Sequence, residues 1–282
     1  MAITAKMVQE LRERTGAPLM DCKRALESSQ GDLEAAIDSL RKAGLKSAEK
    51  RAGRSTAEGR VRAWVAPNAQ LGSIVALTSE TDFVAKTEEF GKLAEALAAH
   101  VAQRAPADVD ELMRQEFAGG GPIAETIKSM SGKMGENMQV AGLARLENAK
   151  GRVGAYVHHD NKQGALVSIT SSKPAAEIDA FLRTLAMHVV ARKPIALKRE
   201  EIPAATVERE RGVYLESEDV LAKPAEKREF IVKGKLEKYF ATSALLEQPW
   251  VLDDAVPVQK ALAAALGADA RIEGFALCLA SA

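Results

Sequence analysis

The sequence predicts an α+β protein built from several modules, and three observations carry this prediction. The chain has 282 residues, more than a single compact core usually organises. Apolar residues recur at helical spacing through residues 1–45. Further on, residues 59–106 are repeated at 151–194, and each copy is typical of strand, turn, strand and helix. We therefore expect a small helical module followed by a duplicated mixed core.

The first module is predicted to be a three-helix domain over residues 1–45. Its helices are separated at Gly16, which favours a helix end, and at a turn whose Asp32 can cap the third helix. Gly44 is expected to end that third helix. Residues 46–58 lack apolar periodicity and are rich in charged and small residues, so we expect a solvated linker there.

The rest of the chain is predicted to form two core subdomains. The first repeat with a helical insert occupies 59–150, and the second repeat belongs to 151–282. Within the second subdomain, apolar residues at heptad-like spacing are interrupted once at Pro224. This pattern predicts an antiparallel coiled-coil hairpin over about 203–241 that projects from the core.

The two repeats differ by a short addition in the first copy. Ser79 matches Ser171 at an offset of 92 residues. His100 matches His188 at an offset of only 88. The first copy therefore carries four extra residues, which fall around 81–84. Duplicated units share what folding needs, so an addition confined to one copy is a candidate for function.

Composition and charge exclude several classes of protein. Thirty-nine basic residues balance thirty-nine acidic ones, so the chain creates no global field that would attract nucleic acid or an anionic membrane. No apolar run approaches the ~20 residues of a bilayer span, and the N-terminus is charged and amphipathic instead of resembling a secretion signal. We expect a cytoplasmic protein without direct contact to nucleic acid or membrane.

Catalytic, metal and cofactor motifs are also missing from the sequence pattern. The pair Gly132-Lys133 lacks the remainder of a phosphate-binding loop. His100 and His188 are repeat equivalents, which favours a packing role over catalysis. Cys22 and Cys278 have neither metal-ligand nor disulfide-framework spacing, and both are expected to be buried thiols. A cysteine-dependent enzyme using Cys22 stays as an alternative, but we expect no enzyme, no metal and no cofactor.

The segment TDFVAK, residues 81–86, is the strongest candidate for a binding element. It lies where the second strand of the first repeat passes into a helix, so Ser79 or Thr81 can cap that helix and Asp82 lies at its positive end. One interpretation is structural, with Phe83 fastening the helix to the sheet. The other is functional, with Phe83 and Asp82 forming an exposed wedge for a partner, a role that suits aromatic anchors.

Four blocks of sequence, in order, resemble the elongation factor Ts family. LRERTGA at 11–17 with MDCKRAL at 20–26 is similar to the family's first signature, and TDFVAK at 81–86 is similar to its second. Gly135-Glu136-Asn137, and Met187-His188-Val189 with Lys193-Pro194, match further blocks. Two places depart from the family's common pattern, Pro18-Leu19 and Ala141-Gly142.

The resemblance implies a fold, a partner and a set of contact residues. The fold would be a ubiquitin-associated-like N-terminal domain, a core of two similar subdomains and a coiled-coil hairpin. The partner would be elongation factor Tu, GDP-bound or nucleotide-free, with the chain acting as a guanine-nucleotide exchange factor that displaces magnesium. The implied contacts are Thr81, Asp82, Phe83 and Val84 near the magnesium site, Leu11 and Met20 in the N-terminal domain, and Tyr156 and His158 in the second subdomain.

A different class of protein stays open beside this one. A ubiquitin-associated-like adaptor or chaperone that binds helices or peptides would also use a three-helix domain and a hairpin. That alternative leaves the four-residue addition without a role. The nucleotide-exchange function is therefore the leading hypothesis.

Overall fold

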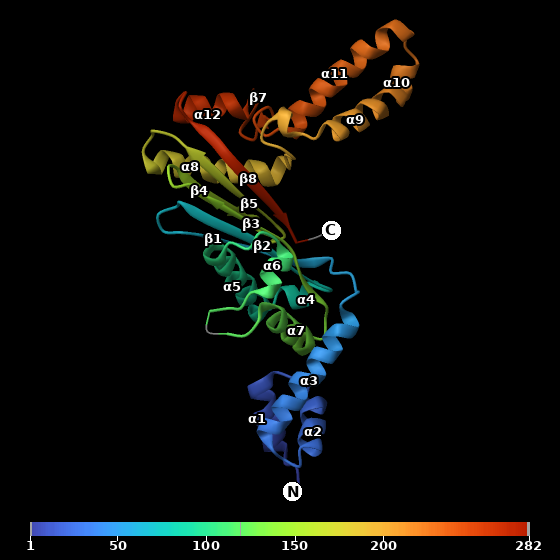
Figure 1. Cartoon of the computed structure of the whole chain (residues 1–282), viewed down its shortest axis with the longest axis vertical. Coiled ribbons are helices and arrows are strands. Elements are labelled where there is room, and N and C mark those ends of the chain that lie inside the picture. Colours follow the sequence, from blue (N-terminus) through green and yellow to red (C-terminus); the bar gives the residue numbers. More distant parts are fainter. Residues whose placement is uncertain (1, 119, 281–282) are drawn as a thin grey trace.

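The computed structural model describes residues 2–118 and 120–280. Outside the described residues lie residue 119, residue 1 of the first predicted domain and residues 281–282 of the last. The molecule is elongated, with a helical bundle at the N-terminal end, antiparallel sheets in the middle and a pair of helices at the far end (Figure 1). The expected α+β class is confirmed.

Three helices form the N-terminal bundle: α1 (Ala5–Thr15), α2 (Leu19–Ser28) and α3 (Leu33–Arg51). Gly16 adopts a left-handed conformation with φ 65° at the end of α1, which glycine tolerates without strain. The side chain of Asp32 accepts a hydrogen bond from the amide of Ala35 at 3.0 Å and caps α3. The helices enclose a small apolar core made of Val8, Leu11, Cys22, Ala25, Leu26 and Ala36.

The third helix is longer than predicted. It continues through Gly44 to Arg51, so the prediction that the helix ends at Gly44 and a linker begins at residue 46 is wrong. Gly44 instead lies where α3 crosses α7 (Ile123–Met134), and a Cβ atom on Gly132 would stand 2.7 Å from the Gly44 backbone. The glycine therefore permits close approach of two helices, and packing offsets its cost of ~1 kcal/mol in a helix interior.

The first core sheet has the strand order β1-β2-β3 and is antiparallel throughout. Its strands are β1 (Glu58–Val65), β2 (Leu71–Ser79) and β3 (Met138–Glu147). Between β2 and β3 the chain forms α4 (Asp82–Ala85), α5 (Glu88–Arg104), α6 (Val109–Arg114) and α7. Apolar side chains of these helices pack against the sheet around Val75, Leu77, Phe90 and Leu97.

The second core sheet has the order β4-β5-β8, again antiparallel. It consists of β4 (Arg152–Val157), β5 (Gln163–Thr170) and β8 (Arg271–Leu279), covered by α8 (Ala175–Arg192) and α12 (Val258–Leu266). In each sheet the register between the central and the third strand shifts by one residue, at Ala76/Leu77 in the first sheet and at Ser168/Ile169 in the second. The repeat in the sequence is therefore a repeat in the backbone.

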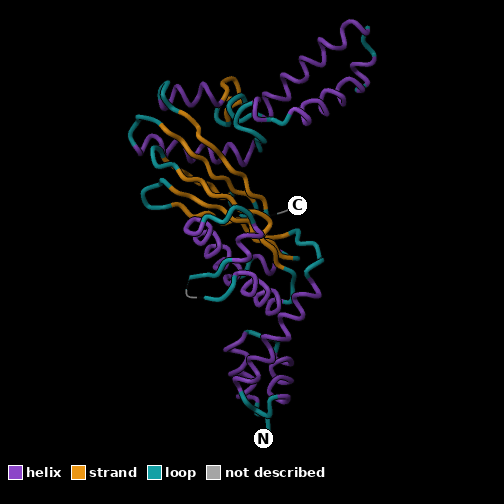
Figure 2. Tube along the Cα trace, viewed as in Figure 1, coloured by secondary structure: helices purple, strands orange, loops and turns teal. Residues whose placement is uncertain are grey.

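The two sheets pack on each other through equivalent contacts. The amide of Val61 donates to the carbonyl of Asn161 at 2.6 Å, and the amide of Val153 donates to the carbonyl of Ala69 at 2.5 Å. Figure 2 shows the strands gathered in the middle of the molecule with helices outside them. The apolar core between the sheets consists of Val61, Ile74, Ala76, Val153, Leu166, Cys278 and Ala280.

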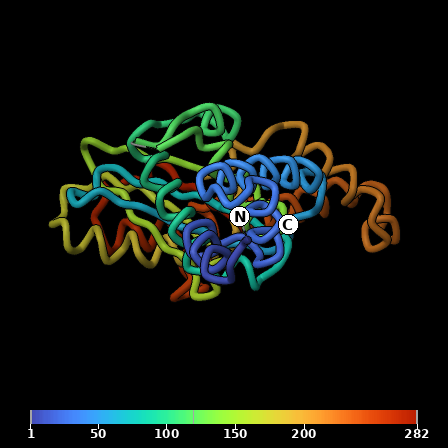
Figure 3. Tube along the Cα trace, turned by 90° about the horizontal axis from the view of Figure 1, so that it is seen from below, coloured from blue at the N-terminus to red at the C-terminus, as the bar shows by residue number. Residues whose placement is uncertain are grey.

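A helical hairpin follows α8 and the short 3-10 turn η1 (Arg199–Glu201). It consists of α9 (Ala204–Glu216), α10 (Glu218–Leu221) and α11 (Ala225–Ser243), and it projects to one side of the molecule when viewed from below (Figure 3). Arg211 and Glu229 form an ion pair at 2.8 Å across it. Two short strands that the sequence pattern did not indicate, β6 (Pro249–Trp250) and β7 (Asp253–Pro257), follow the hairpin. Among the described residues, no helix is both long and apolar enough to cross a membrane.

Candidate functional site

The four-residue addition in the first repeat corresponds to a helix that the second repeat lacks at that place. Residues 80–87 join β2 to α5 and contain α4, whereas residues 171–174 join β5 directly to α8. The extra length is therefore used to build one helical turn at the edge of the first subdomain. The helix α4 is therefore not required by the duplicated fold, and it lies where the comparison of the repeats predicts a functional element.

Two threonines divide this connection into two helices. Thr81 has extended backbone angles, and its hydroxyl accepts from the amide of Val84 at 3.5 Å, so it caps α4. Thr87 does the same for α5 by accepting from the amide of Phe90 at 3.3 Å. The expected threonine cap is present, but it belongs to the short helix and not to the long one.

Neighbouring side chains on α4 point in opposite directions. Val84 is buried at 8% exposure and Ala85 at 3%, so they fix the helix to the core. The Phe83 side chain is 82% exposed. The interpretation in which Phe83 fastens the helix to the sheet is therefore wrong, because Val84 has that position. The ring is therefore accessible to a partner on a helix that is itself anchored, an arrangement that suits an aromatic anchor of an interface.

Asp82 is an ionised, half-exposed carboxylate beside Phe83. Its Oδ2 atom accepts from the ammonium of Lys86 at 2.6 Å, and this hydrogen bond holds the pKa of Asp82 below its usual value. The charge of Lys162 lowers that pKa further. Lys162 lies in the turn between β4 and β5, and its ammonium forms an ion pair with Glu58 of β1 at 2.6 Å.

Tyr156 and His158 belong to the same β4–β5 region. The hydroxyl of Tyr156 lies 3.0 Å from Nδ1 of His158, and the two rings meet edge to face at 6.0 Å between centroids. The amide of His158 donates to the carbonyl of Gln163 at 2.8 Å, which closes the turn that carries Lys162. The structure therefore brings the two second-subdomain candidates together at the end of β4.

The N-terminal candidates separate into one accessible and one inaccessible residue. Met20 is 61% exposed, and its neighbour Leu19 is 51% exposed. Leu11 is completely buried in the core of the bundle. In the free chain the Leu11 side chain holds the bundle together, and its contact with a partner stays a prediction. Met20 and Leu19 form a small apolar surface at the start of α2.

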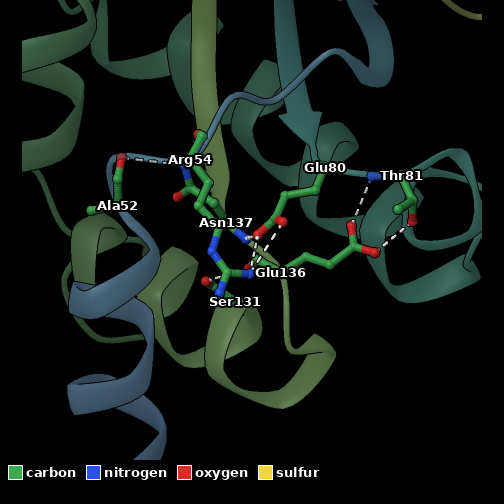
Figure 4. A network of polar contacts seen from close by, with 7 residues as sticks. All are labelled: Ala52, Arg54, Glu80, Thr81, Ser131, Glu136 and Asn137. Atoms are coloured by element: carbon green, nitrogen blue, oxygen red, sulfur yellow. Dashed lines mark hydrogen bonds and ion pairs between the residues drawn. The ribbon is translucent and has the colours of Figure 1, made fainter.

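A carboxylate from the turn between α7 and β3 holds the start of α4. Glu136 accepts the backbone amide of Thr81 at 3.0 Å through Oε2 and the hydroxyl of Thr81 at 2.5 Å through Oε1 (Figure 4). The backbone carbonyl of Glu136 in turn accepts from the hydroxyl of Ser131 at 2.5 Å. Both hydrogen-bond donors of Thr81, its amide and its hydroxyl, are thereby bound to one side chain.

The same turn is bonded to the segment that leaves the N-terminal bundle. The amide of Asn137 donates to Glu80 at 2.6 Å, and its side chain donates to the carbonyl of Arg54 at 2.7 Å and to that of Ala52 at 3.3 Å. Arg54 forms an ion pair with Glu80 at 3.3 Å. In the sequence, Gly135-Glu136-Asn137 stands out only as a matching block, and nothing in its spacing indicates contact with residues 80–81.

The described residues were compared with the arrangement that a metal site would need. They contain no cluster of three or more histidine, cysteine or carboxylate side chains able to hold a metal ion. Cys22 and Cys278 are both buried, as predicted, and burial raises the pKa of the Cys278 thiol to about 11. Gly132, part of the Gly-Lys pair weighed as a phosphate-binding loop, lies inside α7 against α3.

Comparison with known proteins gives one consistent result. The family model described as "Elongation factor TS" matches residues 80–278. Elongation factor Ts of Trichlorobacter lovleyi is 40% identical over 287 residues, which covers 98% of this chain and 92% of that protein. Elongation factor Ts of Thioalkalivibrio sulfidiphilus is 40% identical over 276 residues, covering 98% and 91%. The protein of the same name from Rhizobium rhizogenes is 39% identical over 286 residues, covering 98% and 92%.

Proposed function

The chain belongs to the elongation factor Ts family, and on that premise we propose that α4 is the element that opens elongation factor Tu and releases its GDP. Family membership makes the chain a translation elongation factor whose activity is nucleotide exchange on elongation factor Tu. The observation that carries the proposed site is Phe83, an 82% exposed aromatic ring on a helix anchored by buried Val84.

The physical basis of exchange lies in how a GTPase holds its nucleotide. GDP is bound largely through its phosphates, by a lysine and backbone amides of the phosphate-binding loop and by magnesium. Moving the segment that carries the magnesium, or turning a peptide of the loop, removes much of this grip. In our proposal Phe83 inserts between side chains of the partner and displaces that segment, with Thr81, Asp82 and Val84 forming the rest of the contact.

Two further surfaces support binding in this proposal. Met20 and Leu19 present apolar side chains on the N-terminal bundle, whose ubiquitin-associated-like character is part of the proposal. Tyr156 and His158 lie in the region of the turn that places Lys162 near Asp82. These surfaces can hold the partner while Phe83 acts, so binding and displacement are separable in this proposal. The coiled-coil character of the hairpin and its share in binding belong to the same proposal.

The exchange reaction needs no covalent step and no bound cofactor. The factor and GDP weaken each other's binding to elongation factor Tu by the same factor, because linkage between two ligands is reciprocal. The chain therefore accelerates exchange in both directions and leaves the final occupancy to the concentrations of GDP and GTP. We place this activity in the cytoplasm, with elongation factor Tu, either GDP-bound or nucleotide-free, as the partner, and without direct contact to nucleic acid or membrane.

The test is the release of a fluorescent GDP analogue from elongation factor Tu into excess unlabelled GDP. We expect substoichiometric amounts of the chain to accelerate release, since an exchange factor turns over. No acceleration by a folded chain would contradict the function and favour the adaptor, which would bind the partner without changing release.

The contribution of Asp82 is tested in the same assay with a matched control. Asp82, in α4, pairs with Lys86 at 2.6 Å. Glu88, at the start of α5, forms the same type of pair with Lys92 at 2.6 Å. We expect Asp82→Ala to slow release several-fold and Glu88→Ala to leave it unchanged. Equal effects of the two variants would assign the loss to general helix stability and not to contact with the partner.

A further inference from the structure

We infer that Glu136 is the positioning residue of the wedge: its carboxylate holds Thr81 and so fixes the direction in which Phe83 leaves the core. The inference rests on the proposed function of α4 and adds a residue that does not itself belong to the 81–84 element. Glu136 lies in the turn after α7, 55 positions along the chain from Thr81, so its contact with α4 is made only by the fold.

The need for such a residue follows from the length of α4. A helix of four residues is too short to be stable by its own hydrogen bonds, because a single turn fixes several dihedral angles for one bond. Burial of Val84 and Ala85 attaches the end of the helix to the core, and the hydroxyl of Ser79 donates to the carbonyl of Thr81 at 3.0 Å. Glu136 adds the two contacts from another part of the chain, since it accepts both the amide and the hydroxyl of Thr81, the residue that caps the helix.

The second repeat contains a related bond without the wedge. Asp269, in the turn between α12 and β8, accepts the amide of Ser172 at 2.8 Å, just after the end of β5. The turn between α7 and β3 has the corresponding place in the first repeat. A carboxylate that holds the chain after the central strand is thus common to both repeats. Only in the first repeat does it reach the cap of an additional helix.

The Glu136 turn also joins the wedge to the N-terminal bundle. Asn137 bonds to the carbonyls of Ala52 and Arg54, just after α3, while Glu136 bonds to Thr81 (Figure 4). Two adjacent residues therefore fix the exit of the bundle and the base of the wedge to one turn. A partner gripped by the bundle through Met20 would then meet Phe83 at a defined position. Binding energy is converted into displacement only if the wedge does not yield.

The test measures the maximal rate of GDP release and the concentration of the chain that gives half of it. We expect Glu136→Ala to lower the maximal rate about tenfold with little change in the half-saturating concentration, because misplacing a positioned group by ~1 Å is costly while the binding surfaces are retained. Glu136→Gln keeps the length of the side chain and one oxygen to accept the amide of Thr81, while its NH2 group can donate to the Thr81 hydroxyl in place of accepting from it, so it should restore most of the rate. An unchanged maximal rate in Glu136→Ala would overturn the inference.

A double variant separates positioning from general stability. If Glu136 acts only through the wedge, adding Glu136→Ala to Phe83→Ala should produce no further loss. The same fold-loss in both backgrounds would overturn the inference. Asp269→Ala is the matched control, since it removes the corresponding bond of the second repeat, and it should leave the maximal rate unchanged.

The test also provides for a variant that does not fold and for a wild-type chain that is inactive. If Glu136→Ala does not fold, as judged by its melting temperature, Glu136→Asp carries the test, because its shorter side chain cannot reach both groups of Thr81. If the wild-type chain fails to accelerate release, the proposed function fails. If the wild-type chain is active and Glu136 variants match it, only the positioning role fails.

Discussion

At the scale of single residues, the two repeated histidines show how polar side chains are accommodated in a core. Nε2 of His100 lies 2.8 Å from Oε1 of Gln115, and Nε2 of His188 lies 2.9 Å from Oε1 of Gln248. Each histidine also contacts an aromatic ring, Phe117 for the first and Trp250 for the second. The equivalence of these contacts supports the packing role that the repeat predicted.

His188 makes the stability of the second subdomain dependent on pH. Its side chain is completely buried, burial lowers its pKa, and its Nδ1 atom has no hydrogen-bond partner among the described residues. Above about pH 6.5 the His188 side chain is neutral in both the folded and the unfolded chain, so its titration costs no stability. Below that pH the unfolded chain binds a proton that the folded chain resists, and the free energy of unfolding falls.

Urea unfolding between pH 8 and pH 5 measures this effect. We expect the free energy of unfolding to fall by at most about 1.4 kcal/mol per pH unit from this one group. His188→Gln, which cannot be protonated, should lose that part of the slope. The same slope in the variant and the wild type would contradict the assignment to His188.

Residue-level sequence reasoning succeeded where the pattern itself carried the information. The four-residue offset between the repeats located α4, because an addition to one copy is visible without a structure. It did not show that Val84 is buried and Phe83 exposed, since a single turn of helix has no periodicity to read. Motif membership named Leu11 without showing that its side chain is completely buried in the free chain, because a motif does not separate a buried position from an exposed one.

At the scale of elements, the crossing of α3 and α7 determines where the N-terminal bundle lies. Gly44 and Gly132 bring the two backbones together, and ion pairs Arg41–Glu125 at 3.3 Å and Lys128–Glu49 at 3.5 Å flank the crossing. These exposed pairs contribute little by themselves, so close packing is the main determinant. The helix was predicted to end at Gly44 because glycine usually weakens a helix, and tertiary contact overrode that preference.

Replacement by alanine is expected to have opposite effects on stability at two helical glycines, one at the crossing and one in open space. Gly132→Ala places a methyl group 2.7 Å from the Gly44 backbone and should destabilise the protein by about 1–3 kcal/mol. Gly234 lies in α11, and a methyl group added there would meet nothing within 4 Å, so Gly234→Ala should stabilise by about 0.5–1 kcal/mol. Denaturant unfolding of both variants checks the signs, and a neutral Gly132→Ala would contradict the close crossing.

At the scale of the whole molecule, duplication explains most of the architecture. Two copies of the same unit supply the two sheets, with equivalent shifts of register and equivalent bonds between the turns of one copy and the strands of the other. The repeat in the sequence therefore predicted most of the core. The packing of the sheets and the Glu136 network depend on contacts between distant residues, which periodicity does not encode. The strands β6 and β7 pair locally, but they are too short to show an alternation of apolar residues.

The central claim is that the exposed ring of Phe83 drives nucleotide release, and the most direct measurement compares two phenylalanines. Phe83 and Phe230 are each 82% exposed, the first on α4 and the second on α11 of the hairpin. In the GDP-release assay we expect Phe83→Ala to lower the maximal rate by ~30-fold, the effect of losing a contact worth about 2 kcal/mol. Phe230→Ala should change that maximal rate by less than about twofold, since a binding contact of the hairpin would alter the half-saturating concentration and not the displacement step. Equal rates for the two variants would contradict the account.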